Sequence, residues 1–210
     1  ILTNGGFKVG LMGTIGTYFD GEKQESSLTT LGSIELYKTM RNMVDRGINV
    51  LCMEVSAHAI EQKRCYGVFF DYLVFTNCTE DHLDYFNSMR EYEEVKKSIF
   101  SFDNCKYMIV NSDDKVGREI INSNEGNLIT YGIDNPSDVF AINVRESENG
   151  ISYVINLFDE IYEIKSKLFG LCNVYNTLSA CTVASILGVN IHLISLTLKN
   201  LSPISGRAEL

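Results

Sequence analysis

Short segments made almost entirely of apolar residues recur through the first two thirds of the chain, and segments with helical spacing separate most of them. The apolar segments are residues 8–12, 48–55, 72–76, 106–111 and 128–131, and the helical ones are residues 29–46, 57–63, 88–100 and 113–123. A strand that is apolar along its whole length is covered on both faces, and strands that alternate with helices pair in parallel. The pattern therefore predicts an α/β fold with a mostly parallel sheet flanked by helices.

The pattern changes at residue 139. Apolar and polar residues alternate between 139 and 168, and turn signals stand at 147–150 and 159–160, which predicts a small antiparallel β-meander. Helical spacing returns at 173–187 and 191–201. Because we find no internal repeat and no low-complexity segment, residues 1–210 are predicted to form a single domain.

Composition excludes several classes of protein. The chain is 45% hydrophobic with two prolines, which excludes wholesale disorder and Pro-rich architecture. The net charge of −9 argues against nucleic-acid binding through a broad basic surface, and no apolar run approaches the roughly 18 residues needed for membrane insertion. The six cysteines form no C-x-x-C pair, so we expect buried, reduced thiols rather than a zinc site.

The start of the chain is unusual, because Ile1 stands where a methionine is expected and residues 1–6 have the pattern of a helix end with a glycine stop. We expect the sequence to be a piece of a longer polypeptide. Residues 13–17 have the glycine spacing of a phosphate-binding P-loop, but Thr17 stands in place of its lysine. We interpret them as a strand end and loop leading into a turn at 18–21.

Polar side chains gather after two of the predicted strands. Glu54, Ser56 and His58 follow the first, and Asp81 and His82 follow the second. Ligands of open parallel sheets bind at the carboxyl ends of strands, and oxygen-rich clusters with one histidine suit Mg²⁺ or Mn²⁺. The alternative is that these residues cap helices or face solvent. On composition alone, the charged segment 91–97 is a solvated helix face.

Taken together, these motifs resemble the central ATPase domain of the Mur ligases, a P-loop NTPase-like domain, and most closely the MurE-type ligases that act on UDP-N-acetylmuramoyl-dipeptide. The resemblance runs through nearly all of the chain. It is carried by residues 53–58, 75–77, 81–85, Tyr92 with Lys96, 110–114, Gly170 with 173–176, and 206–209.

The resemblance implies an ATP-dependent amide ligase of peptidoglycan synthesis in the bacterial cytoplasm, working as a monomer. ATP activates the D-glutamate carboxylate of UDP-MurNAc-dipeptide as an acyl phosphate, which the amine of diaminopimelate or lysine attacks, with two Mg²⁺ ions clamping the phosphates. Glu54 and His82 resemble metal ligands, and Lys96 resembles a lysine that is carbamylated in this family. The positions that resemble substrate-binding ones are Thr29, Thr30, Ser56, Gln62 and Arg64. Asn173, Asn176 and Arg207 resemble positions near the nucleotide.

The family's glycine-rich phosphate-binding loop is expected to lie ahead of Ile1, and its N-terminal UDP-binding and C-terminal amino-acid-binding domains are expected to be absent. The 210-residue chain alone is therefore expected to be inactive. Two alternatives stay open: a related amide ligase, similar to folylpolyglutamate or cyanophycin synthetases, and a non-catalytic binding module with the same fold. The choice between diaminopimelate and lysine is not encoded in this part of the family's sequence.

Overall fold

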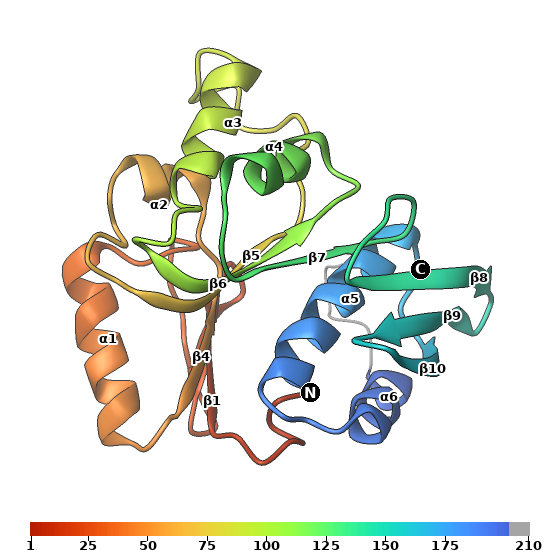
Figure 1. Ribbon diagram of the computed structural model, residues 1–210. Helices are drawn as coiled ribbons and strands as arrows, with labels where there is room; N and C mark the ends of the chain where they lie inside the picture. Colours follow the sequence, from red (N-terminus) through yellow and green to blue (C-terminus); the bar gives the residue numbers. More distant parts are fainter. Residues whose placement is uncertain (202–210) are drawn as a thin grey trace.

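The computed structural model describes residues 1–201, which form two sheets and the helices that cover them (Figure 1). One sheet has the strand order β3-β2-β1-β4, and the other has the order β10-β9-β8-β7-β6-β5. The α/β class, the mostly parallel pairing and the antiparallel meander are confirmed. The parallel strands, however, are divided between two sheets, since β4 ends one and β5 ends the other.

The first sheet contains a hairpin that the sequence did not predict. Its strands are β1 (Val9–Gly13), β2 (Gly16–Phe19), β3 (Glu22–Gln24) and β4 (Val50–Met53), with β1 parallel to β4 and antiparallel to β2. Residues predicted as a loop and a turn thus form β2 and the β2–β3 turn. The reason for the error is that β2 has four residues and β3 is fully exposed, so neither shows a hydrophobic alternation.

The second sheet joins parallel strands to the predicted meander. The parallel part consists of β5 (Phe70–Phe75), β6 (Cys105–Asn111) and β7 (Leu128–Gly132), and the meander consists of β8 (Val139–Ser147), β9 (Gly150–Leu157) and β10 (Glu160–Ser166). Strands β7 and β8 pair in parallel at Tyr131↔Val139 and Gly132↔Phe140. The meander is therefore an extension of the parallel sheet.

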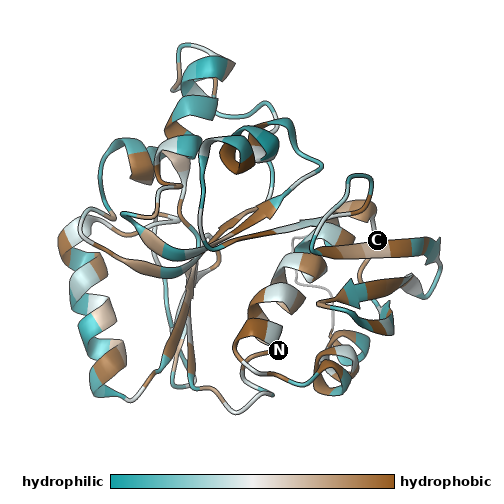
Figure 2. Ribbon diagram, viewed as in Figure 1, coloured by the Kyte–Doolittle hydropathy of each residue, from teal (hydrophilic) through white to brown (hydrophobic). Residues whose placement is uncertain are grey.

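Six helices complete the described part of the chain: α1 (Ser33–Asp45), α2 (Ala57–Glu61), α3 (Met89–Ser98), α4 (Lys115–Ser123), α5 (Leu171–Ile186) and α6 (Ile191–Asn200). Side chains alternate between the two faces of a strand, and β6 shows the result. Met108 and Val110 pack in a cluster with Val116 and Ile120 of α4, whereas Ile109 packs with Leu178 of α5. Helices α4 and α5 therefore cover opposite faces of this sheet. The side of each helix that faces the sheet is apolar (Figure 2). Within residues 1–201 we find no helix long and apolar enough to span a bilayer.

Two details of helix ends bear on the function. The Phe7 amide donates to the Leu2 carbonyl and the Gly6 amide to the Thr3 carbonyl, with Gly6 at φ +89°, which is the hydrogen-bond pattern of a helix C-terminus. This confirms the predicted helix end. Helix α1 begins at Ser33 rather than at residue 29, because Thr30 is used for contacts with the strand end described below.

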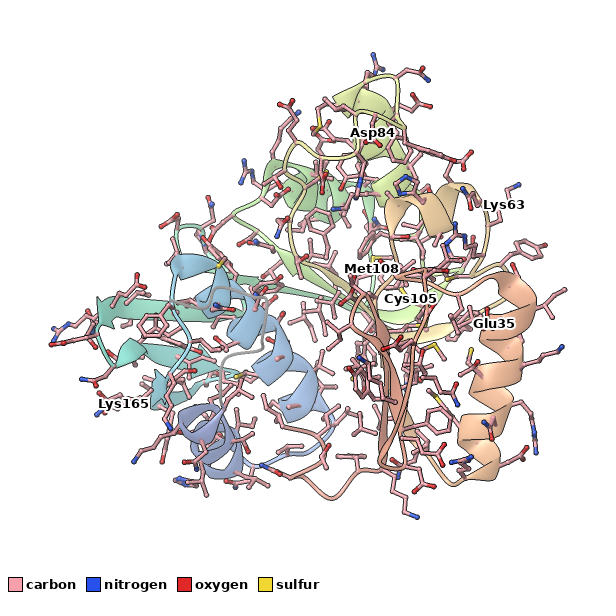
Figure 3. All side chains as sticks on the ribbon, turned by 180° about the vertical axis from the view of Figure 1, so that it is seen from behind. Glu35, Lys63, Asp84, Cys105, Met108 and Lys165 are labelled. Atoms are coloured by element: carbon pink, nitrogen blue, oxygen red, sulfur yellow. The ribbon has the colours of Figure 1, made fainter. Side chains whose placement is uncertain are left out.

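All six cysteines are free, but not all are buried as predicted. Cys65, Cys105 and Cys181 are buried, whereas Cys52 and Cys172 are exposed. Cys105, the first residue of β6, belongs to the same buried cluster as Met108 (Figure 3). Burial raises the pKa of Cys105 to about 11 and that of Cys181 to about 12, which suppresses their thiolates at neutral pH.

A thiol titration tests this arrangement. With Ellman's reagent at pH 8, we expect Cys172 and Cys52 to react in the native protein, Cys172 first, because burial raises the pKa of Cys52. Cys105 and Cys181 should react after unfolding in urea. Rapid labelling of either buried thiol in the folded protein, located by peptide mass mapping, would contradict the packing.

Candidate active site

The candidate site lies at the carboxyl ends of β4, β5 and β6, where helices α2 and α3 pack against each other (Figure 1). Glu54 follows β4 and is exposed. Its carboxylate is nevertheless fixed: Oε2 accepts hydrogen bonds from Thr14 Oγ1 at 2.7 Å and from the Thr14 amide at 3.1 Å. A Cβ at Gly13 would come within 2.7 Å of this carboxylate, so glycine is what allows the close approach.

Thr14 lies in residues 13–17, which have the glycine spacing of a P-loop but lack its lysine. Its hydroxyl also lies 3.1 Å from that of Thr29. The segment therefore holds the carboxylate of Glu54. The sequence shows a glycine–threonine pair after an apolar strand. It does not show that Thr14 binds Glu54, which lies 40 residues further along the chain.

Thr30 is 1% exposed and joins two parts of the site. Its hydroxyl donates to the Glu54 carbonyl and accepts from the Ser56 amide, both at 3.0 Å. Ser56 in turn caps α2, as predicted, by accepting from the Ala59 amide. The backbone on both sides of Val55 is therefore held by one buried hydroxyl.

Arg64 extends this network. Its Nη1 donates to the Thr30 carbonyl at 2.9 Å, and its Nε and Nη2 donate to Gln62 Oε1 at 3.0 and 2.6 Å. Gln62 Nε2 donates to the hydroxyl of Tyr85 at 3.2 Å. The structure thus places all the predicted substrate-binding positions in one hydrogen-bonded group with Glu54. They are Thr29, Thr30, Ser56, Gln62 and Arg64.

His82 and Lys96 both lie close to the aromatic ring of Tyr92. The His82 ring lies 6.0 Å from the Tyr92 centroid, and Lys96 Nζ lies 5.2 Å from the same centroid. Lys96 does not extend into solvent, because its ammonium donates to the Asn77 carbonyl, just after β5, at 2.7 Å. His82 also packs edge-on against His58, with the ring centroids 4.9 Å apart, which connects it to α2.

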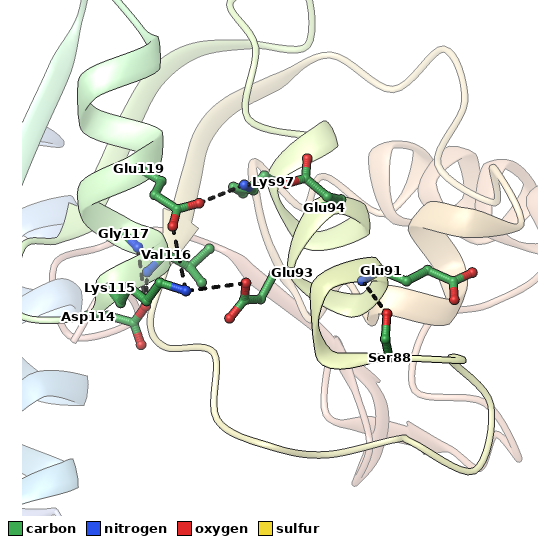
Figure 4. Close-up of polar contacts among 10 residues, drawn as sticks. All are labelled: Ser88, Glu91, Glu93, Glu94, Lys97, Asp114, Lys115, Val116, Gly117 and Glu119. Carbon is green, nitrogen blue, oxygen red and sulfur yellow. Dashed lines mark hydrogen bonds and ion pairs between the residues drawn. The ribbon is translucent and has the colours of Figure 1, made fainter.

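The rest of α3 behaves as a solvated face, as its composition indicated. Lys97 pairs with Glu94 and with Glu119 of α4, and Lys115 pairs with Glu93 (Figure 4). The hydrogen bond from Lys97 lowers the pKa of Glu119. These surface pairs link α3 to α4, and Lys96 stands apart from them because it faces the strand end.

No three His, Cys, Asp or Glu side chains within residues 1–201 come together as a ready-made metal cage. Mg²⁺ commonly binds through one or two protein carboxylates and completes its shell with water and substrate phosphates. Glu54 offers one carboxylate of that kind, and His82, on a separate element, has the carboxylate of Asp81 beside it, with Oδ2 3.5 Å from Nε2. Glu54 and His82 do not fit one closed protein site.

Residues that follow β6 hold the carboxyl edge of the sheet together, a role that was not predicted from the sequence. Asp113 accepts hydrogen bonds from the amides of Ile133, Asp134 and Asn135 and from the hydroxyl of Tyr175 on α5. Burial of Asp113 by itself raises its pKa, but these hydrogen bonds outweigh burial and lower the pKa overall.

Asn111 and Asp114 tie the same segment to the end of β5. Asn111 Nδ2 donates to the Thr76 carbonyl, and Asp114 accepts from the Cys78 amide while it caps α4 through Val116 and Gly117 (Figure 4). In the sequence, this role could have been inferred from the run of polar residues that follows the apolar strand at 106–111. The ends of β5, β6 and β7 are thereby fixed relative to one another.

The predicted nucleotide-binding asparagines lie at the start of α5, which the Tyr175–Asp113 hydrogen bond brings to this edge. Asn173 Nδ2 donates to the Phe169 carbonyl, and Asn176, which is exposed, donates to Asn173 Oδ1. Arg207 lies outside the described residues.

The role of Thr30 can be tested by removing its hydroxyl. Thr30→Val keeps the shape but leaves the Ser56 amide and the Glu54 carbonyl without their partner, so we expect a loss of about 2 kcal/mol in unfolding free energy. Thr30→Ser keeps the hydroxyl and should lose less than Thr30→Val. Urea denaturation measures both, and equal losses for the two variants would show that the hydroxyl is not what matters.

A family model described as the Mur ligase middle domain matches residues 1–184. The UDP-N-acetylmuramoyl-L-alanyl-D-glutamate--2,6-diaminopimelate ligase of Bacillus cereus is 36% identical over 97% of this chain, and that of Geobacillus thermodenitrificans is 37% identical over the same share. The chain spans 43% of the length of each of these relatives.

Solved structures agree at the level of the fold. A structure of a UDP-N-acetylmuramoyl-L-alanyl-D-glutamate--2,6-diaminopimelate ligase superposes with a TM-score of 0.88 at 24% identity, over 98% of this chain and 43% of its own. The structure of a type C pseudomurein peptide ligase from Methanothermus fervidus superposes with a TM-score of 0.63 at 22% identity. The match covers 76% of this chain and 40% of that ligase's chain. The chain belongs to the Mur ligase middle domain family.

Proposed function

We propose that this chain is the central part of an ATP-dependent ligase that joins a diamino acid to UDP-MurNAc-L-Ala-D-Glu in the bacterial cytoplasm. The relatives' names support this reaction and favour diaminopimelate over lysine. The observation that carries the proposal is the single hydrogen-bonded group of Glu54 with the five predicted substrate positions. It supports the proposal because it links Glu54, whose carboxylate suits a metal ion, through Thr30 to Arg64, whose guanidinium suits an anionic substrate.

In the proposed reaction, an oxygen of the D-glutamate carboxylate attacks the γ-phosphorus of ATP, and ADP leaves. The amine of the diamino acid then attacks the resulting acyl phosphate, loses a proton, and displaces inorganic phosphate as the amide forms. Arg64 is suited to orient an acidic group, because hydrogen bonds to Thr30 and Gln62 preorganise its guanidinium. Asn173 and Asn176 are proposed to lie near the nucleotide.

Glu54 and His82 are the residues that we propose hold Mg²⁺ at the phosphates. A bound Mg²⁺ supplies charge that stabilises the transferring phosphoryl group. Lys96 is proposed to act after carbamylation, in which its neutral amine adds CO₂ and releases a proton. The modification would replace a cation beside the Asn77 carbonyl with an anion and break that hydrogen bond.

The test uses the complete ligase from the same coding region. We expect ADP release that requires ATP, Mg²⁺, UDP-MurNAc-L-Ala-D-Glu and diaminopimelate together, with mass spectrometry showing the amide product. Turnover with L-lysine but not with diaminopimelate would show that lysine is the amino-acid substrate and that the reaction is still an amide ligation. Glutamylation of a folate, or binding without turnover, would overturn the proposal in favour of the two alternatives.

A further inference from the structure

The turn that carries His82 is held by the residues around it rather than by its own backbone preference. His82 has φ +56°, in the left-handed region that is uncommon for residues other than glycine. A residue stays in such a region only when its surroundings determine it. The His82 carbonyl accepts hydrogen bonds from the amides of Tyr85 and Phe86, both at 3.0 Å, so residues 82–86 form one tight turn. The position of the His82 ring therefore depends on what anchors this turn.

One anchor of the turn is apolar. Phe86 is 2% exposed and belongs to the same buried cluster as Ala57 at the start of α2 and Tyr92 of α3. The Phe86 and Tyr92 rings lie 5.3 Å apart between centroids. Apolar packing stabilises the turn but has no preferred direction. Phe86 therefore keeps the turn on the protein without aligning it with the polar groups of the site.

The second anchor is polar, and it is the hydroxyl of Tyr85. This hydroxyl donates to Glu61 Oε2 at 2.9 Å and accepts from Gln62 Nε2 at 3.2 Å. Within residues 1–201, no other hydrogen bond joins residues 81–87 to α2 or to Gln62, the residue that follows it. Gln62 Oε1 also accepts from Arg64. The Tyr85 hydroxyl therefore ties the turn to the predicted substrate-binding positions.

The imidazole of His58 completes the connection. Its centroid lies 4.2 Å from that of Tyr85 and 4.9 Å from that of His82, and the two imidazoles meet edge-on with 81° between their planes. His58 is half-buried on α2, so it offers both rings of the turn a surface that belongs to the helix. Tyr85 and His58 together connect Gln62 to His82.

We propose that Tyr85 is a positioning residue for the ligase reaction: its hydroxyl aligns the His82 turn with α2, so that an occupied substrate-binding group holds His82 in place. This inference rests on the proposed function and gives a role to a residue outside the predicted site positions. The hydrogen bond to the Glu61 carboxylate is charge-assisted and fixes a direction that ring packing does not.

The test compares Tyr85→Phe with Tyr162→Phe in the complete ligase. Both changes remove one hydrogen-bonded hydroxyl and keep the ring, but Tyr162 lies on β10, away from α2, and contacts His192 (Figure 1). Amide hydrogen exchange without any ligand is followed by mass spectrometry. We expect residues 82–87 to exchange about fivefold faster in Tyr85→Phe, the effect of losing a hydrogen bond, and at an unchanged rate in Tyr162→Phe. Equal exchange in the two variants would overturn the proposal.

A second measurement adds UDP-MurNAc-L-Ala-D-Glu without Mg²⁺. We expect this ligand to slow exchange of residues 82–87 in the unsubstituted ligase, and Tyr85→Phe to abolish the slowing. In steady-state kinetics, the Mg²⁺ concentration for half-maximal activity should rise about tenfold in Tyr85→Phe, the effect typical of losing support for a metal ligand. The kcat at saturating Mg²⁺ should stay within about threefold, because excess metal ion compensates for weaker binding. Tyr162→Phe should change neither quantity.

The outcomes separate the two proposals. Slowing of residues 82–87 by the ligand that persists in Tyr85→Phe, or an unchanged Mg²⁺ requirement, would overturn the positioning role. Faster ligand-free exchange in Tyr85→Phe, combined with no response of the unsubstituted ligase to UDP-MurNAc-L-Ala-D-Glu, would overturn the proposed function and not the anchoring of the turn by Tyr85.

Discussion

Replacing Glu54 with glutamine in the complete ligase is expected to lower kcat by about 10²–10³-fold, the effect typical of losing one electrostatic contact to the transition state. The amide keeps the size of the side chain and can still accept from Thr14, so the local fold should survive. What is lost is the negative charge proposed to hold Mg²⁺. We therefore also expect the Mg²⁺ concentration that gives half-maximal activity to rise.

The matched control is Glu35→Gln, the same change at an exposed position in the first turn of α1 (Figure 3). It should leave ADP release and its Mg²⁺ dependence unchanged. If Glu54→Gln stays within about threefold of the unsubstituted enzyme at low Mg²⁺, a difference of less than 1 kcal/mol, the metal-ligand assignment is wrong.

Asp113→Ala is expected to destabilise the chain by about 3 kcal/mol near pH 7. The substitution removes the acceptor for three backbone amides and for the Tyr175 hydroxyl. The loss should uncouple α5 from the end of β6. Urea denaturation followed by circular dichroism measures the change.

The pH dependence of this effect has a definite sign. The folded-state pKa of Asp113 lies below its unfolded value, so its contribution to stability is fully present above the unfolded pKa, near 4. The contribution is lost as pH falls through the folded pKa. In urea denaturations at pH values from 5 down to 2.5, the stability difference between the unsubstituted protein and Asp113→Ala should therefore begin to shrink at about pH 4.

The control for this prediction is Asp134→Ala, at an exposed carboxylate in the loop that Asp113 holds. It removes the same charge but none of the hydrogen bonds that Asp113 accepts, and should change stability by less than about 0.5 kcal/mol. A constant difference between Asp113→Ala and the unsubstituted protein across the pH range would show that the charge of Asp113 is not what stabilises the loop.

The parallel strands and their helices were predictable because burial on two faces leaves long apolar runs, as in β6. The β2–β3 hairpin was not, since its strands are short and its outer strand is polar. The start of α1 was placed too early because helical spacing takes no account of the tertiary contacts of Thr30, a buried residue bonded to the strand end at Glu54.

The candidate site divides in the same way. The polar groups after β4 and β5 were visible in the sequence, because carboxyl ends of parallel strands gather at one edge. Their exact partners were not visible, since Thr14 reaches Glu54 across 40 residues and Tyr175 reaches Asp113 across 62. Periodicity describes which face a residue occupies, and pairings between distant loops leave no trace in it.

The division between β4 and β5 also governs how the 210-residue chain unfolds. Ladder hydrogen bonds make a sheet melt as a unit, and the described ladders stop at β4 in one sheet and at β5 in the other. The lobe built on α1, β1 and β4 and the lobe built on β5 to β10 therefore lack a shared ladder. Opening of the smaller lobe need not await the larger one, so the Thr30 variants report on the stability of the smaller lobe and Asp113→Ala on that of the larger.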